Sequence, residues 1–291
     1  MDRSLISLQH LNTCSTQDFI SILGPVFENA PWVCEAVRHE RPFSSLTTLH
    51  ASLIEKLFDL PEERLLSFLR GHARLSSETL RRGTTPESTH EQKSVGLDQL
   101  DDVTAAQIDQ WNITYETRFG FPFILAVRNA SLATLLASFE RRLHSSPEME
   151  RREAIAEISA ISWMRLLDRI RPGHTGGLST HVLDTVRTRP AAGLKVELWQ
   201  ITQARTKRIA SSLTDEGGRV DIEESEGVEI KAGQYEWRFD TSSYFAEHGY
   251  PTLSRTYLGN VKIGFAVWNP EEHYHVPLLL TPGSYTIYRG N

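Results

Sequence analysis

The spacing of apolar residues changes about 170 residues into the sequence, and this change constrains the fold more than any other feature. Before it, apolar residues recur every three to four positions, for example over 132–139, as in amphipathic helices. After it, they alternate with polar residues, for example over 235–239, as in half-buried antiparallel strands. We therefore predict an all-α helical bundle over 1–170 and an all-β sandwich over 178–291, joined by a loop-like linker at 171–177.

Local signals place several elements more closely. Ser15 and Asp18 have the spacing of a capping box at the start of a helix. Another helix is expected between Pro61 and Gly71, with Leu65, Leu66, Phe68 and Leu69 on its buried side. The long final helix of the first half is expected over 154–170. In the second half, 241–248 is expected to form one short helix that ends at Gly249.

Composition narrows the class of protein. The 291 residues carry 31 Lys and Arg against 37 Asp and Glu, a net charge of −6, which gives no electrostatic reason to bind nucleic acid or an anionic membrane. Two cysteines, Cys14 and Cys34, are too few for a disulfide framework, which favours a reducing compartment. No apolar run has the roughly 18 residues that a membrane span needs. We expect a soluble cytoplasmic protein, with the peroxisome as the alternative.

The second half contains four motifs rich in His, Arg and Gly. They are Ser179-Thr-His181-Val-Leu-Asp184, Asp215-Glu-Gly-Gly-Arg219, His273-Tyr-His275-Val-Pro277 and Tyr288-Arg289-Gly290. In this order they resemble the motifs of the transthyretin-like 5-hydroxyisourate hydrolases. The resemblance implies a transthyretin-like sandwich that opens an oxidised purine ring by hydrolysis. A histidine with a pKa of about 6.5 can activate water, and an arginine can polarise a carbonyl.

The resemblance also assigns residue roles. It implies that His181, Arg219 and His275 are catalytic. It further implies that the substrate site is lined by His273, Tyr288, Arg289 and Gly290. The terminal Asn291 replaces the Ser that usually ends the family, so the role of the last side chain does not carry over.

These residues also have simpler interpretations. His181 could be a surface or hydrogen-bonded strand residue, and Arg219 a hairpin residue without a role. His273 and His275 alternate on one strand, a spacing that also occurs in zinc sites, and Pro277 is expected to interrupt the edge of that strand. Because the resembling family works without a metal, we predict no metal and no cofactor. Vertebrate transthyretin, a hormone carrier without catalysis, lacks the His-bearing motifs.

The first half resembles the decarboxylases of 2-oxo-4-hydroxy-4-carboxy-5-ureidoimidazoline (OHCU). The resemblance covers residues 27–32, 71–75, 88–92, 111–112 and 118–124, together with Arg165. It implies that His72, Glu91 and Arg165 are catalytic in a cofactor-free decarboxylation. It also implies a substrate-binding set, which is Ser88, Gln92, Phe119, Gly120, Phe121, Pro122, Phe123 and Ile124.

Each of these positions has a structural alternative. Ser88 and Glu91 have the spacing of a capping box. Arg165 shares a helix face with apolar residues, where an arginine usually extends its charged end to solvent or forms a structural ion pair. The 119–123 segment could be a packed turn, and we expect His90 to be solvated. Ala73 and Ser76 replace a Pro and a Gly of the family, which predicts a looser loop around His72.

The two implied reactions are consecutive, so the chain resembles the bifunctional allantoin synthases. 5-Hydroxyisourate would be hydrolysed to OHCU, and OHCU decarboxylated to (S)-allantoin. The expected partners are these small molecules and further copies of the chain in a dimer or tetramer, with a functional link to urate oxidase. Two alternatives are that only the hydrolase half is active, or that the chain is a transthyretin-like binding protein without turnover.

Overall fold

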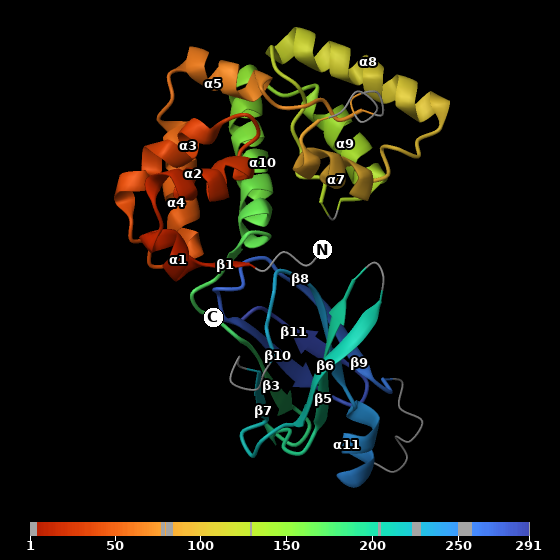
Figure 1. Cartoon of the computed structure of the whole chain (residues 1–291). Coiled ribbons are helices and arrows are strands. Elements are labelled where there is room, and N and C mark those ends of the chain that lie inside the picture. The colour runs from red at the N-terminus through yellow and green to blue at the C-terminus, as the bar shows by residue number, and fades with distance from the viewer. Residues whose placement is uncertain are drawn as a thin grey trace. The chain divides into compact units, whose positions relative to one another are not determined.

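The structure is a computed structural model in which two compact units, residues 1–173 and 174–291, follow one another along the chain (Figure 1). The first is helical and the second is built from strands, so the predicted fold class is confirmed. The division between the units falls inside the segment predicted as a linker. The residues that the structure describes are 5–76, 79, 84–128, 130–202, 205–222, 228–249 and 258–290.

The helical unit is organised around its longest helix, α10 (Pro147–Leu167). Figure 1 shows α10 between two groups of helices, α2 to α4 and α7 to α9. The other elements are β1 (Ile6–Ser7), α1 (Leu8–Thr13), α2 (Thr16–Leu23), η1 (Gly24–Val26), α3 (Pro31–Val37), η2 (Arg38–Glu40), α4 (Leu46–Phe58), α5 (Glu62–Arg70), α7 (Pro86–Ser94), α8 (Asp102–Phe119), α9 (Leu132–Arg142) and β2 (Ile170–Arg171). No helix in the described part of the chain is long and apolar enough to cross a membrane.

Helix boundaries follow the caps more closely than the apolar pattern. Ser15 caps α2 as predicted, because its hydroxyl accepts the backbone N–H of Asp18 at 3.1 Å. The boundaries predicted for the last helix were wrong at both ends. The helix begins at Pro147 and ends at Leu167. The prediction missed its first two turns because they are charged and show no apolar periodicity. Ile170 instead pairs with Ile6 in a short parallel β ladder.

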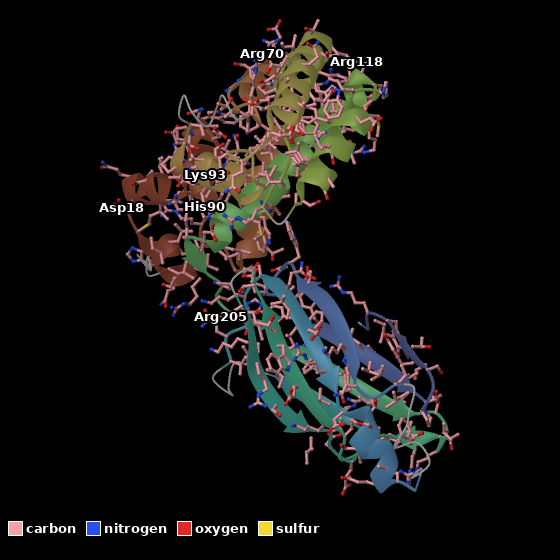
Figure 2. The ribbon with its side chains drawn as sticks, turned by 90° about the vertical axis from the view of Figure 1, so that its right-hand side faces the viewer. Asp18, Arg70, His90, Lys93, Arg118 and Arg205 are labelled. Carbon is pink, nitrogen blue, oxygen red and sulfur yellow. The ribbon has the colours of Figure 1, made fainter. Side chains whose placement is uncertain are left out.

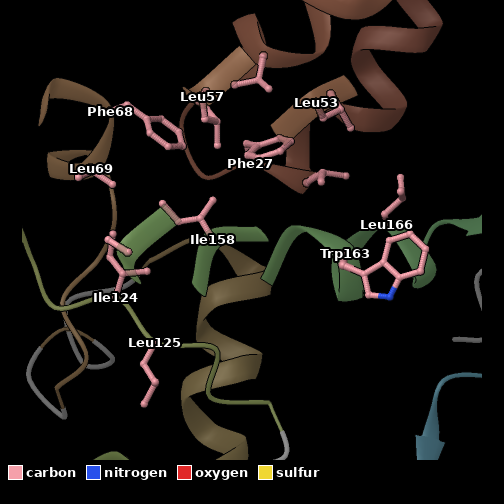
Figure 3. Packing of buried hydrophobic residues seen from close by; sticks show 14 of the residues in the cluster. Phe27, Leu53, Leu57, Phe68, Leu69, Ile124, Leu125, Ile158, Trp163 and Leu166 are labelled. Atoms are coloured by element: carbon pink, nitrogen blue, oxygen red, sulfur yellow. The ribbon is translucent and has the colours of Figure 1, made fainter. Parts of the chain in front are cut away.

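The core of the helical unit lies along one face of α10. In Figure 3, Ile158 and Leu166 of α10 extend towards the side on which Phe27 and Leu53 lie, and all four are buried. Burying a side chain of this size contributes about 1.5–3 kcal/mol. On α5, Phe68 and Leu69 are buried, but Leu65 and Leu66 are half-buried, so the predicted buried face of that helix was too wide.

The second unit is a sandwich of two sheets. Strands β6-β5-β8-β9 form one sheet; in the other the order is β11-β10-β3-β4, and β7 also pairs with β3. The elements are β3 (Leu178–Asp184), β4 (Arg189–Pro190), β5 (Lys195–Ile201), β6 (Thr206–Leu213), β7 (Arg219–Ile222), β8 (Gly233–Phe239), α11 (Thr241–Glu247), β9 (Val261–Val267), β10 (Tyr274–Leu280) and β11 (Tyr285–Ile287). Helix α11 confirms the short helix predicted here and ends one residue earlier than expected.

Along β3, successive side chains alternate between the core and the outer face of the sheet. Leu178 and Val182 are buried in the cluster between the sheets. Because successive side chains of a strand point to opposite faces, Ser179 and His181 lie on the outer face of their sheet. The same alternation puts His275 of β10 on that face, since its neighbours along the strand are in the core.

Pro277 does not end its strand. Strand β10 continues through it and pairs in parallel with β3, where Pro277 lies opposite His181. On the other side, the antiparallel ladder to β11 stops at Ile287, next to the position where Pro277 has no N–H to offer. The predicted interruption is therefore limited to the ladder with β11.

Candidate active sites

The loop that presents His72 is held from three directions. The side-chain amides of Asn29, Gln92 and Asn112 donate hydrogen bonds of 2.9, 3.1 and 3.1 Å to the carbonyls of residues 71, 74 and 75. Asn29 has a left-handed backbone with φ of 55°, a conformation that Asn tolerates better than most residues. The loosening predicted from Ala73 is therefore countered by tertiary hydrogen bonds that the sequence pattern does not show.

His72 is kept neutral by its surroundings. Burial, together with the charge of the nearby Arg165 guanidinium, lowers the pKa of its imidazole to about 4. Its Nδ1 lies 3.2 Å from the carbonyl oxygen of Phe68. Because a carbonyl can only accept, the proton of the neutral ring is on Nδ1, and Nε2 keeps its lone pair. The ring edge also packs on Phe68, with centroids 5.0 Å apart.

Arg165 and Glu91 form a buried bidentate ion pair. The carboxylate of Glu91 on α7 accepts from Nε and Nη2 of Arg165 on α10 at 2.9 and 2.7 Å. Both side chains are less than a tenth exposed, so of the two structural alternatives for Arg165 the extension to solvent was wrong and the ion pair is present. The capping interpretation was also wrong, because the hydroxyl of Thr85 accepts the backbone N–H of Ser88, which lies inside the helix. His90 on the same helix is exposed, as predicted (Figure 2).

Glu28 is a site residue that the sequence reasoning missed. Its carboxyl lies 4.0 Å from Arg165 and accepts the hydroxyl of Thr84 at 3.3 Å. Burial raises the pKa of Glu28, and the positive charge of Arg165 opposes that shift. It borders a cavity of about 220 Å³ that Trp32 and Phe68 also line. A carboxylate inside the apolar 27–32 segment was the signal that could have found it.

The 119–124 segment is a packed turn. Helix α8 ends at Phe119, and Gly120 terminates it in a left-handed conformation with φ of 80°. The rings of Phe119, Phe121 and Phe123 pack on Tyr115, while Pro122 and Ile124 are buried. The carbonyl of Gly120 accepts from Arg70 Nε at 2.7 Å, which attaches this turn to the end of α5, just before His72.

Gln92 and Ser88 lie next to the ion pair on α7. Gln92 Nε2 is 3.3 Å from the hydroxyl of Ser88, and Gln92 is almost fully buried. Its Oε1 is buried without a hydrogen-bond partner among the described residues. A buried acceptor of this kind is costly unless a ligand or water satisfies it, which suits a substrate-binding position.

In the β unit, strand register assembles the predicted trio. Arg219 on β7 lies directly opposite His181 on β3. On the other side of β3, His275 of β10 lies opposite Ser179, two residues from His181. Three segments that are far apart in the sequence thus meet on the outer face of one sheet. Asp221 shares this face, opposite Ser179.

The two histidines of β10 are joined by a serine. The hydroxyl of Ser179 lies 2.7 Å from His273 Nε2 and 2.8 Å from His275 Nδ1. His273 Nδ1 lies 2.6 Å from the carbonyl oxygen of Gly176, at the end of the predicted linker. Partial burial lowers the pKa of His275; His273, His181 and Arg219 lower it further, and Asp221 opposes the shift.

The C-terminal tail contacts the site through Gly290. Its N–H donates to the carbonyl of His275 at 2.9 Å, and a Cβ at this position would lie 2.4 Å from Cδ2 of the His275 ring. Arg289 instead pairs with Glu272 at 2.9 Å, and the side chain of Tyr288 is exposed. Asn291 lies outside the described residues.

His181 contributes a further unsatisfied group. Its Nε2 is buried without a hydrogen-bond partner in the part of the chain that the structure describes. Such a nitrogen on a sheet face next to Arg219 and His275 is expected where a ligand completes the hydrogen bonding. The described residues contain no group of three or more His, Cys, Asp or Glu side chains arranged to hold a metal ion.

Comparisons with known proteins agree with this division into two sites. Residues 12–167 match the OHCU decarboxylase family, and residues 178–290 match the HIUase/Transthyretin family. The OHCU decarboxylase of Haloferax volcanii is 35% identical over 164 residues, 56% of this chain and 96% of that protein. The 5-hydroxyisourate hydrolase of Pseudomonas aeruginosa is 36% identical over 121 residues, 42% of this chain and 96% of that protein. The chain therefore belongs to both families.

One solved structure spans both units. The crystal structure of an (S)-allantoin synthase matches 98% of this chain and 100% of its own chain, with a TM-score of 0.80 and 29% sequence identity. The chain is thus similar to that protein over both units, in the same order.

Proposed function

We propose that the chain converts 5-hydroxyisourate to (S)-allantoin in two steps, with hydrolysis in the β unit and decarboxylation in the helical unit. The observation that carries the proposal is the similarity to an (S)-allantoin synthase over 98% of the chain. The two neutral histidines, His72 and His275, each beside an arginine, support it chemically. Urate oxidase, or another enzyme that oxidises urate, would supply the first substrate.

Hydrolysis opens a cyclic amide. His275 accepts a proton from water through Nε2, and the resulting hydroxide adds to a ring carbonyl that Arg219 polarises. The C–N bond of the ring then breaks, and the leaving nitrogen takes up the proton held by His275. The new carboxylic acid loses its own proton to solvent and becomes the carboxylate of OHCU. His181 Nε2, which lacks a protein partner among the described residues, hydrogen-bonds the substrate.

Decarboxylation uses the helical site. His72 accepts the proton of the substrate hydroxyl through Nε2. The bond to the carboxylate breaks, carbon dioxide leaves, and the electron pair moves into the adjacent carbon–nitrogen double bond. The nitrogen of that bond then takes up the proton held by His72, which returns His72 to its neutral form. Glu91 occupies Nε and Nη2 of Arg165, so Nη1 is the donor that holds the substrate. Ser88, Gln92 and the 119–124 turn form the walls of this site.

The second reaction consumes a proton, because a carboxylate anion becomes carbon dioxide and a neutral product. Glu28 supplies this proton to the ring carbon. Its burial favours the protonated acid, and it lies beside Arg165 at the centre of the site. The cavity that it borders gives a route for a new proton from solvent. Delivery from one side sets the configuration of (S)-allantoin.

We also propose that the chain is a homo-oligomer that associates through β11. This strand is at the edge of its sheet, and Tyr285 and Ile287 are each 42% exposed on it. An apolar edge strand is a ready surface for pairing with another copy. Sedimentation should give a dimer or tetramer, and Ile287→Lys should shift it towards monomer.

The test of the two-step function is to generate 5-hydroxyisourate with urate oxidase and follow absorbance and circular dichroism together. Rapid loss of both intermediates with a chiral allantoin signal supports the proposal. His275→Ala should then remove only the first step and His72→Ala only the second. If OHCU decays at its spontaneous rate with the unaltered protein, only the hydrolase unit is active. If both intermediates do, the chain is a binding protein.

A further inference from the structure

We propose that Ser179 and His273 are positioning residues that hold His275 in the tautomer with its lone pair on Nε2. This inference rests on the proposed hydrolysis in the β unit. It assigns a role to Ser179, and a role to His273 other than contact with substrate. It also makes Gly176, near the end of the segment predicted as a linker, a part of the hydrolysis site.

The hydrogen-bond directions follow from one fixed acceptor. The carbonyl of Gly176 can only accept, so the proton of neutral His273 is on Nδ1, 2.6 Å away. His273 Nε2 must then accept the hydroxyl proton of Ser179 at 2.7 Å. The oxygen of Ser179 in turn accepts from His275 Nδ1 at 2.8 Å. With its proton on Nδ1, His275 presents Nε2 as the base.

The backbone geometry around Gly176 keeps this acceptor in place. A Cβ on Gly176 would lie 2.0 Å from the carbonyl carbon of Glu272 and 2.4 Å from the backbone nitrogen of His273, so only glycine permits the approach. The N–H of Gly176 also donates to the carbonyl of Pro270 at 2.9 Å. Ser179 itself is only 8% exposed, so water competes little for its hydroxyl.

Protonation of His273 would reverse the order of donors. Both ring nitrogens would then donate, the Ser179 hydroxyl would turn to His275 Nδ1, and the proton of His275 would move to Nε2. The groups that face His275 are His273, His181, Arg219 and Asp221. Hydrolysis should therefore fall on acidification more steeply than the titration of a single histidine predicts.

The experiment compares Ser179→Ala with Ser179→Thr in the full chain. Thr keeps the hydroxyl and fits a strand, whereas Ala breaks the link between the histidines. Ser211→Ala, at an exposed position of β6, is the matched control. We expect Ser179→Ala to lower kcat for 5-hydroxyisourate about 10- to 100-fold with little change in KM, as when a partner that orients a histidine ring is removed. The Thr variant should restore most of it.

Two further readouts separate tautomer control from simple packing. Ring ¹⁵N NMR, with the His275 signals identified from a His275→Gln variant, should show the proton on Nδ1 in the unaltered protein and a shift towards Nε2 in Ser179→Ala. The acid limb should become less steep in that variant. Full hydrolysis by Ser179→Ala with an unchanged tautomer would overturn the inference, as would loss in Ser179→Thr equal to that in Ser179→Ala. If the unaltered chain does not hydrolyse 5-hydroxyisourate, the proposed function fails instead.

Discussion

The two candidate sites are built in opposite ways. In the helical unit, the side chains of Arg165 and Glu91 are less than a tenth exposed. These two residues lie on different helices and are 74 positions apart in the sequence. In the β unit, His275 is half-buried and Arg219 is exposed, and both are located by strand register. Because the charges of the first site are buried, the interactions between them are strong, and the loss of either charged partner is costly. The second site depends mainly on the orientation of each ring.

The largest expected effect is on the buried ion pair. Glu91→Ala should destabilise the helical unit by about 3 kcal/mol, because it removes the bidentate partner of a buried charge and leaves only Glu28, 4.0 Å away, near Arg165. It should also abolish decarboxylation and leave hydrolysis intact. Urea unfolding of each unit, followed with separate probes, measures the loss. Asp168→Ala removes the more exposed pair with Arg128 and should cost below about 1 kcal/mol. Equal costs for the two variants would contradict the comparison.

The next effect concerns the proton donor. Glu28→Gln keeps the shape and a hydrogen-bond donor but cannot deliver a proton, so decarboxylation should slow by about 100-fold while the fold is kept. The share of (S)-allantoin should fall as uncatalysed protonation from either face takes over. Circular dichroism of the product measures both quantities. An unchanged rate and optical purity would exclude Glu28 as the donor.

A smaller effect is expected in the β unit. Gly290→Ala places a Cβ 2.4 Å from the His275 ring, and relieving the overlap should cost about 1–3 kcal/mol, in stability or by displacement of the ring. Hydrolysis should slow about 10-fold, since about 1.4 kcal/mol in a barrier corresponds to that factor, while decarboxylation is unaffected. Gly283→Ala, where the added Cβ meets nothing within 4 Å, is the control. Unaltered hydrolysis in Gly290→Ala would show that the tail does not control the ring.

The smallest effect is a difference in pH dependence. A histidine whose pKa is lowered stays neutral, and able to act as a base, until the pH falls to that lower value. Burial lowers the pKa of His72 to about 4, while the half-buried His275 has a smaller shift below 6.5. On acidification, hydrolysis should therefore be lost at higher pH than decarboxylation. Rates of the isolated steps between pH 4 and 7 check the order, and the reverse order would contradict the burial argument.

Sequence patterns say more about which candidate residues come together in the β unit than in the helical unit. A period of two fixes which residues share a sheet face, and the motifs around His181 and His275 identified strands that the structure pairs directly. In the helical unit the same approach singled out His72, Glu91 and Arg165, and the structure adds Glu28 beside Arg165. The approach also predicted a loose loop at Ala73. The pattern could not show that three side-chain amides hold this loop, because they come from the distant residues 29, 92 and 112. Such contacts have no local signature.

The sequence by itself determined the two-domain architecture, the strands and most helices, and the residues able to carry the chemistry. Apolar period, caps and motifs are local properties, so one chain is enough to read them. Only the tertiary structure decided that Glu28 and Glu91 share one arginine, and that a serine joins His273 to His275. These outcomes depend on which distant side chains meet in a dry interior or on one sheet face, and that is a property of packing rather than of spacing along the chain.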